Sequence, residues 1–206
     1  SARLFIPSPS ASARASDGSS RCSPLAVSHS SGRPSPSVSA NTVTVIDGNT
    51  YGTSLVPVGT EPIAVAVNPV TNKVYVANYA ASTVTVIDGA TNATQTLLVG
   101  SQPTDIAVNT QTDRIYVTNN GDNANSVSVI NGITNAVTTV STMAWPISIA
   151  INEVTNKIYI GHDSGSFNSQ VTLIDGATNT STPIPIEGGR SYGIAVNPIT
   201  NKVYAT

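Results

Sequence analysis

Few residues in this sequence have side chains that could act as a nucleophile or a general base. The two histidines are His29 and His162, and the single cysteine is Cys22. The string His162-Asp163-Ser164 contains the residue types of a hydrolase triad, but neighbours in sequence do not have triad geometry. We therefore expect His162 to be a solvated loop residue and Cys22, in a serine-rich stretch, not to be a catalytic thiolate. No catalytic residue is predicted.

Oxygen-bearing side chains that could bind a metal gather in one stretch. Residues 119–125 read Asn-Asn-Gly-Asp-Asn-Ala-Asn, which lacks the carboxylate spacing of a calcium loop. A phosphate-binding loop is a glycine-rich string followed by a helix, and the sequence contains no such combination. We predict a turn-rich surface loop at 119–125, with no metal site and no cofactor.

One set of positions varies in a way that suggests recognition rather than catalysis. Seven residues before a recurring Asn come four unlike side chains: Glu61, Gln102, Trp145 and Arg190. Tryptophan and arginine are enriched at binding hot spots. Whether these four side chains share a surface depends on the elements that carry them.

An internal repeat identifies those elements. One motif occurs four times, with its first Asn at positions 68, 109, 152 and 197 and a Tyr seven residues later. A second motif, Val/Leu-Ile-Asp/Asn-Gly, has its Asp or Asn at 47, 88, 131 and 175. Successive first Asn residues are 41, 43 and 45 residues apart, and most of this growth lies in one connection. Insertions in one connection per unit map to one face of a repeat protein.

Each unit contains four short runs rich in Val, Ile and Thr. In the second unit the predicted strands are 63–67, 74–77, 83–87 and 94–99, separated by turns that contain Asn, Pro, Asp and Gly. In these turns we expect Gly to adopt positive φ, and Asp47, Asp88 and Asp175 to have a structural role. Four strands in about 41 residues is the size of a β-propeller blade.

We therefore predict an all-β fold, a β-propeller of four-stranded antiparallel blades, with about four blade equivalents present. The first strand of each blade is expected near the axis, and the repeated Tyr between facing sheets. The predicted units are a half blade at 41–59, full blades at 60–100, 101–141 and 142–187, and a half blade at 188–206. The two halves could join into a fourth blade, but we favour a fragment of a longer, seven-bladed propeller.

The repeat resembles that of the YVTN-family β-propellers, which include surface-layer-type proteins. The resemblance rests on Val74-Tyr75-Val76-Ala77-Asn78 and Ile115-Tyr116-Val117-Thr118-Asn119, each followed by Val-Thr/Ser-Val-Ile-Asp/Asn-Gly, and covers about residues 41–206. The next unit departs from the pattern with Tyr159-Ile160-Gly161-His162, which puts the turn after this strand in question. The resemblance implies a seven-bladed propeller of the bacterial or archaeal cell surface or periplasm.

Residues 1–40 differ in composition from the rest of the chain. They contain fourteen Ser, five Pro and four Arg, and too few apolar residues to offset the entropy cost of ordering, so we predict disorder. Because the repeat begins abruptly near residue 41, a further hypothesis is that residues 1 to about 38 are frameshifted sequence rather than an ordinary linker. Translation of the coding DNA in the other two frames would distinguish the two.

The charge balance restricts the classes of partner. Residues 1–40 hold four Arg and one Asp (+3), and residues 41–206 hold five Lys or Arg and ten Asp or Glu (−5), giving a net charge of −2. Nucleic-acid affinity depends on clustered cations, so nucleic acid is not an expected partner. No apolar run approaches 18 residues, and no membrane span is predicted.

Two functions are compatible with a propeller of this composition. The first is a non-enzymatic extracytoplasmic binding or scaffold module, which would hold a protein, glycan or small molecule at the rim of the central opening, where Glu61, Gln102, Trp145 and Arg190 are expected. The second is a lactonase-like hydrolase with a metal at the axis, for which only Glu61 and Asp105 supply carboxylates along the first strands. The shortage of catalytic groups favours the binding module.

Overall fold

The computed structural model describes residues 41–121, 124–163, 170–187 and 190–206, and every regular element in this part is a strand. The strands are β1 (Thr42–Ile46), β2 (Thr53–Pro57), β3 (Pro62–Asn68), β4 (Lys73–Asn78), β5 (Thr83–Asp88), β6 (Thr94–Leu98), β7 (Pro103–Asn109), β8 (Arg114–Asn119), β9 (Ser126–Asn131), β10 (Val137–Ser141), β11 (Pro146–Asn152), β12 (Lys157–His162), β13 (Gln170–Asp175), β14 (Ser181–Pro185), β15 (Ile194–Asn197) and β16 (Lys202–Ala205). The predicted strands of the second unit are confirmed, within about a residue, as β3 to β6. Residues 1–40, for which disorder was predicted, lie outside the described residues. Cys22 and His29 belong to this stretch.

The strands form antiparallel sheets in chain order. Three sheets have four strands each (β3 to β6, β7 to β10 and β11 to β14), and two hairpins, β1–β2 and β15–β16, form the remaining sheets. The register repeats from sheet to sheet, since Tyr75 is opposite Val86 and Tyr116 is opposite Val129. The four-stranded antiparallel blade is therefore confirmed as the unit of the fold.

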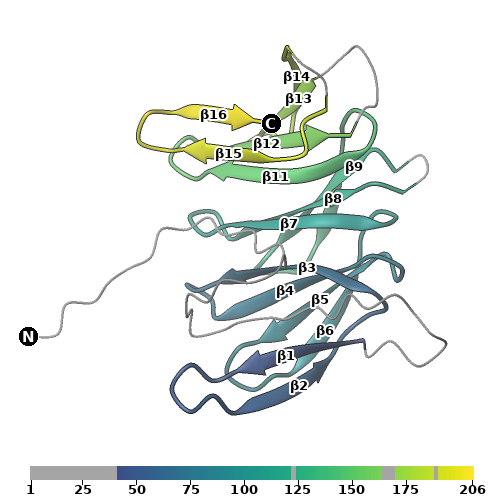
Figure 1. Cartoon of the computed structure of the whole chain (residues 1–206), viewed down its shortest axis with the longest axis vertical. Helices are drawn as coiled ribbons and strands as arrows, with labels where there is room; N and C mark the ends of the chain where they lie inside the picture. The colour runs from purple at the N-terminus through teal and green to yellow at the C-terminus, as the bar shows by residue number, and fades with distance from the viewer. Residues whose placement is uncertain (1–40, 122–123, 164–169, 188–189) are drawn as a thin grey trace, which may run out of the picture.

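The sheets fan out from their first strands. Strands β3, β7, β11 and β15 contact one another in sequence, β3 with β7, β7 with β11 and β11 with β15, and they lie along one side of the molecule (Figure 1). Because the first strands lie close together, the sheets diverge towards their last strands. This radial arrangement is that of a propeller and agrees with the prediction that the first strand lies innermost.

The apolar cores lie between neighbouring sheets. Tyr75 and Ile106 belong to the core between the β3–β6 and β7–β10 sheets, and Tyr116 and Ile158 to the core between β7–β10 and β11–β14. Tyr75 and Tyr116 are fully buried, whereas Tyr204, in β16, is 56% exposed. Burial, together with the nearby Asp113 carboxylate, raises the pKa of Tyr75 to about 12. Tyr75 and Tyr116 therefore lie between facing sheets, as predicted.

The first Asn of the repeat hydrogen-bonds each sheet to the next. Asn68 Nδ2 donates to Asp113 Oδ1 at 2.8 Å, Asn109 Nδ2 to Asn156 Oδ1 at 3.0 Å, and Asn152 Nδ2 to Asn201 Oδ1 at 2.9 Å. The Oδ1 atom of the same Asn accepts two backbone N–H groups of its own turn; for Asn109 these belong to Gln111 and Thr112. One side chain thus stabilises the turn between the first two strands and fastens two sheets together; we call this the Asn bridge.

The glycines of the second motif have a different role from the one predicted. Positive φ in these turns belongs to Asn92, Asn135 and Asn179, not to the glycines. The Gly132 N–H donates to the Asp113 carbonyl at 2.8 Å, and a Cβ at Gly132 would overlap the Asp113 carboxylate. The expectation of positive φ was therefore wrong, and Gly is required because the adjacent turn approaches closely.

The aspartates of the same motif have the structural role that was predicted. Asp88 Oδ1 accepts the N–H groups of Ala90 and Thr91, and these hydrogen bonds, with one from the Thr91 hydroxyl, lower the pKa of Asp88. Asp47 and Asp175 accept backbone N–H groups in the same way. Each carboxylate stabilises a tight turn.

The two hairpins do not join into a fourth blade within one chain. Hairpins β1–β2 and β15–β16 are separate sheets, and they lie at opposite ends of the arc (Figure 1). The alternative in which the halves combine intramolecularly is therefore not what the structure shows.

Candidate functional site

The residue that precedes the first strand of a sheet has unusual backbone geometry. Glu61, Gln102 and Trp145 lie immediately before β3, β7 and β11, with φ of 58°, 51° and 53°. Non-glycine residues other than Asn and Asp rarely adopt this left-handed conformation, which is more favourable for glycine. We call these residues, together with Arg190 ahead of β15, the entry residues.

Elsewhere in the chain the left-handed positions are filled as steric rules lead one to expect. Of the thirteen non-glycine residues with positive φ in the described part of the chain, eight are Asn or Asp. The five exceptions are Tyr51, Ser82 and three of the entry residues. Backbone preference alone therefore does not explain a Glu, a Gln and a Trp at equivalent positions.

The backbones of Trp145 and Gln102 are hydrogen-bonded on both sides, through the N–H group and through the carbonyl. The Trp145 N–H donates to Asn125 Oδ1 at 3.2 Å, and the Trp145 carbonyl accepts the Asp163 N–H at 3.0 Å. The same pair of contacts joins Gln102 to Ser82 and Asn120. Trp145 is 49% exposed, and Glu61 and Arg190 are exposed as well. A repeated, fixed backbone thus presents a different side chain from each sheet.

Trp145 borders the one charged cluster that the structure describes on this face. Arg190 Nε lies 3.1 Å from Asp163 Oδ1, and Arg190 Nη1 donates to the Tyr192 hydroxyl at 2.5 Å. The Tyr192 hydroxyl in turn donates to Asp163 Oδ1 at 3.2 Å. The hydrogen bond to Tyr192, followed by the Asp163 charge, raises the pKa of Arg190. The structure therefore brings Trp145 and Arg190 to one junction, between the β11–β14 sheet and the β15–β16 hairpin.

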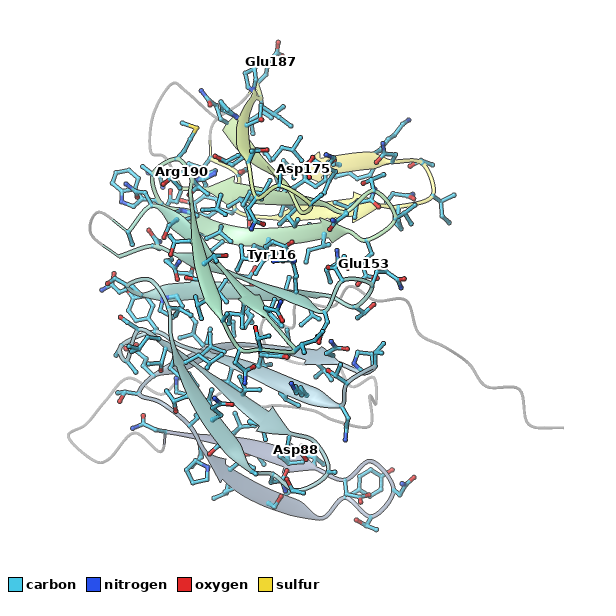
Figure 2. All side chains as sticks on the ribbon, turned by 180° about the vertical axis from the view of Figure 1, so that it is seen from behind. Asp88, Tyr116, Glu153, Asp175, Glu187 and Arg190 are labelled. Carbon is cyan, nitrogen blue, oxygen red and sulfur yellow. The ribbon has the colours of Figure 1, made fainter. Side chains whose placement is uncertain are left out.

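The entry residues and the Asn bridges lie at opposite ends of the first strands. Each entry residue precedes its strand and the bridging Asn ends it, as with Trp145 and Asn152 around β11. In Figure 2 Arg190 lies on one side of the molecule and Glu153, which follows Asn152, on the other. One face thus carries the variable side chains and the other the hydrogen bonds between sheets.

Sequence reasoning missed a second set of variable residues on the face that carries the entry residues, which we call the entry face. Tyr79, Asn120 and Asp163 each follow the second strand of a sheet and donate their N–H groups to the carbonyls of Glu61, Gln102 and Trp145. Their side chains differ from unit to unit just as those of the entry residues do. Comparing the repeats at the residue after the second strand would have found them.

The prediction that His162 is a solvated loop residue is wrong. His162 ends β12 and is 1% exposed. Its Nδ1–H donates to the Ala144 carbonyl at 3.0 Å, so Nε2 accepts the Thr172 hydroxyl at 2.8 Å. The equivalent residues Asn78 and Asn119 also bind hydroxyls of the following strand. His162 therefore substitutes for a structural Asn, and the strand continues through the departure from the repeat.

Burial lowers the pKa of His162 below its ordinary value of 6.5, although the hydrogen bond to Ala144 acts in the opposite direction. The unfolded chain then binds more protons than the folded protein as the pH falls below about 6.5, so the protein loses stability on acidification. The substitution His162→Asn should reduce the loss of stability between about pH 7.5 and 5.5 measured by urea denaturation. His29→Asn is the control; an unchanged pH dependence in the His162 variant would contradict the assignment.

The two carboxylates considered for an axial metal do not converge. Asp105 Oδ1 accepts the Ile106 N–H at 2.9 Å, and Oδ2 accepts the Ile149 N–H of the neighbouring first strand at 3.1 Å. Asp105 therefore fastens β7 to β11, while Glu61 is exposed ahead of β3. Among the described residues no group of three His, Cys, Asp or Glu side chains could hold a metal ion.

The predicted surface loop at 119–125 is described only in part. Asn119 is fully buried, and its Nδ2 donates to the hydroxyls of Ser126 and Ser128. Residues 122–123 lie outside the described part. Asn119 is thus a structural residue rather than a member of an exposed set of oxygen ligands.

The fold and the arrangement of these residues define an all-β protein of β-propeller type. The chain is similar to Kuenenia stuttgartiensis hydrazine synthase, with a TM-score of 0.71, 24% identity and coverage of 80% of this chain and 49% of that one. It is also similar to a chain of a nidogen/laminin complex (TM-score 0.62, 10% identity, 81% and 66% coverage). A third similar structure is the extracellular domain of the putative one component system BT4673 from B. thetaiotaomicron (TM-score 0.57, 12% identity, 82% and 25% coverage).

These similarities show the fold. The chain spans about half the length of the hydrazine synthase chain that it matches. No protein-family model and no curated protein matches the sequence. In the described residues there is no helix that is long and apolar enough to cross a membrane.

Proposed function

We propose that this chain is a non-enzymatic binding or scaffold module of the YVTN-repeat type that acts outside the cytoplasm. The observation that carries the proposal is that three bulky entry residues, Glu61, Gln102 and Trp145, are held at positive φ. A conformation of this kind costs of order 1 kcal/mol or more for a non-glycine residue, and such costs concentrate at functional sites. Glu61, Gln102, Trp145 and Arg190 are, in this proposal, the residues that contact the partner.

The side chains of the entry face fit a partner with both apolar and polar groups. Trp145 offers a large, half-exposed aromatic surface, and aromatic surfaces of this kind dominate binding energy at interfaces. Arg190, Asp163 and Tyr192 hold one another in place, which reduces the entropy lost when a partner binds. A protein, a glycan or a small molecule could supply such groups. The extracellular origin of one similar structure supports a location in the periplasm or at the cell surface.

Binding through the entry face can be tested with a glycan array and an array of peptides from cell-surface proteins. The double substitution Trp145→Ala with Arg190→Ala should weaken any specific binding about tenfold or more, because hot-spot truncations typically cost over 1 kcal/mol. Val154→Ala is the matched control, since Val154 is 79% exposed on the opposite face. If the double variant binds like the unsubstituted protein, or if Val154→Ala weakens binding equally, the entry face is not the site.

A separate measurement tests the absence of enzymatic activity. The purified protein should bind no stoichiometric calcium by elemental analysis and should not hydrolyse lactones. The binding module would be wrong if the protein bound stoichiometric calcium, lost this calcium on Asp105→Asn, and hydrolysed lactones. The lactonase-like hydrolase would then be the function.

A further inference from the structure

The exposed apolar surface of the entry face is aromatic. Trp145 is half-exposed, and Tyr79 and Tyr192 belong to the same face. Exposed aliphatic side chains in the described residues lie elsewhere, at the turns and strand ends of the opposite face (Val67, Val70, Ile133, Val154 and Ile199) or on last strands (Leu55 and Leu98). An aromatic ring with a polar edge suits a partner that has both apolar faces and polar groups.

The cations of the repeats lie mostly on the other face. Four of the five Lys and Arg residues after residue 40 begin the second strands, at the end where the Asn bridges lie (Lys73, Arg114, Lys157 and Lys202). The fifth, Arg190, is paired with Asp163, and Glu61 adds a further carboxylate to the entry face. An anionic ligand such as a phosphate or an acidic polysaccharide would therefore meet no unpaired cation among the described residues of this face.

Two polar groups at the Trp145 junction are available to a partner. Trp145 and Asp163 are neighbours, because the Asp163 N–H donates to the Trp145 carbonyl at 3.0 Å. Asp163 Oδ1 accepts the Tyr192 hydroxyl and lies 3.1 Å from Arg190 Nε, so the carboxylate is held in one orientation. Neither Asp163 Oδ2 nor the Trp145 indole N–H makes a hydrogen bond among the described residues. The junction thus offers one acceptor and one donor together with an aromatic surface.

The entry residues are spaced for an extended partner. Strands β3, β7 and β11 contact one another in sequence, and facing sheets lie about 10 Å apart, so successive entry residues are separated by about this distance or less. The junctions also carry planar amide or carboxylate groups, from Glu61, Gln102, Asn120 and Asp163. A partner with a repeating unit of this size could make the same kind of contact at successive sheets.

A glycan has the chemistry that these groups would recognise. A pyranose ring has an apolar face of C–H groups, which packs on an aromatic ring, and a rim of hydroxyls, each of which can donate and accept a hydrogen bond. Planar carboxylate and amide groups can bond two adjacent hydroxyls at once. A protein partner fits less well, because the centres of protein interfaces are depleted in Asp and Glu. On the basis of the binding function proposed for the entry face, we propose that its partner is a neutral glycan, with a sugar ring stacked on Trp145 and its hydroxyls bonded to Asp163.

Fluorescence tests the stacking directly, because Trp145 is the only tryptophan in the chain. The full chain is titrated with neutral hexasaccharides of glucose, mannose, xylose and N-acetylglucosamine, and with heparin and polygalacturonate as anionic probes. At least one neutral probe should shift the Trp145 emission to shorter wavelength in a saturable way, with equal affinity at about 0.1 and 1 M salt. The anionic probes should not bind.

Substitutions at the junction distinguish a stacked sugar from a general apolar contact. By calorimetry, Trp145→Leu should weaken the binding of that hexasaccharide about tenfold or more, whereas Trp145→Phe, which keeps an aromatic ring, should retain most of it. Asp163→Asn should also weaken binding, about tenfold, because it removes a charged acceptor. Val154→Ala, on the opposite face, is the control and should leave the affinity unchanged.

The outcomes separate the glycan from the binding function on which it rests. A peptide from the array that shifts the Trp145 emission, when no neutral hexasaccharide does so, would overturn the glycan and leave the entry face as the binding site. Binding of an acidic probe that is strengthened by Asp163→Asn would also overturn the neutral glycan, because it would identify an anionic ligand. If neither a sugar nor a peptide binds, or if Trp145→Leu leaves the affinity for the sugar unchanged, both proposals are wrong.

Discussion

Replacement of Asn109 by alanine should lower the free energy of unfolding by about 3 kcal/mol. The substitution replaces a fully buried side chain and removes three hydrogen bonds, each with a net value of about 1 kcal/mol. The lost contacts are those to Asn156 in the next sheet and to the N–H groups of Gln111 and Thr112. Urea denaturation followed by circular dichroism measures the change.

Asn131→Ala is the matched control for this substitution. Asn131 Oδ1 also accepts two turn N–H groups, those of Ile133 and Thr134, but its side chain makes no hydrogen bond to a neighbouring sheet among the described residues. Its replacement should cost about 1 kcal/mol, as for the loss of an exposed cap. Equal losses in the two variants would show that the Asn bridge contributes no more than a turn cap.

Gly132→Ala should destabilise the protein by about 2 to 3 kcal/mol, through contact with a side chain rather than through backbone strain. A Cβ at this position would displace the Asp113 carboxylate, which accepts the Asn68 amide in the Asn bridge to the preceding sheet. The Lys73 ammonium, which donates to the Gly132 carbonyl, would be disturbed as well. Thermal or urea unfolding gives the magnitude.

Two controls separate steric overlap from a general cost of removing glycine. Gly52→Ala should be close to neutral, because the nearest atom, Thr50 Oγ1, lies 3.3 Å from the new Cβ. In an Asp113→Ala background the obstructing carboxylate is absent, so Gly132→Ala should cost much less than it does alone. Additive effects of Gly132→Ala and Asp113→Ala would show that the overlap is not the cause.

The repeat allowed the strands and the fanned arrangement to be predicted, because a pattern that recurs in register reports the same local environment several times. The burial of Tyr75 and Tyr116 followed from the same reasoning. The structural role of His162 was missed because it follows Gly161 in a unit that departs from the repeat. Counting three residues from Tyr159, as from Tyr75 to Asn78, would have identified the equivalence.

Contacts between sheets were beyond the reach of the sequence. Asn68 and its equivalents were recognised as turn formers, which is correct, but their amide groups bind residues 45 to 49 positions away. The glycines were assigned to positive φ because turn statistics describe a turn in isolation. Their actual requirement comes from the adjacent turn of the same sheet. The pairing of Asp163 with Arg190 likewise depends on how one sheet packs on the next.

The separation of the entry residues from the Asn bridges has a consequence for protein engineering. Each first strand has its variable residue at one end and its stabilising Asn at the other, so the two properties can be altered independently. A library randomised at positions 61, 102, 145 and 190, with Gly included for its ease at left-handed φ, would explore new specificities on an unchanged framework. Variants selected from such a library should tolerate heat as well as the parent does.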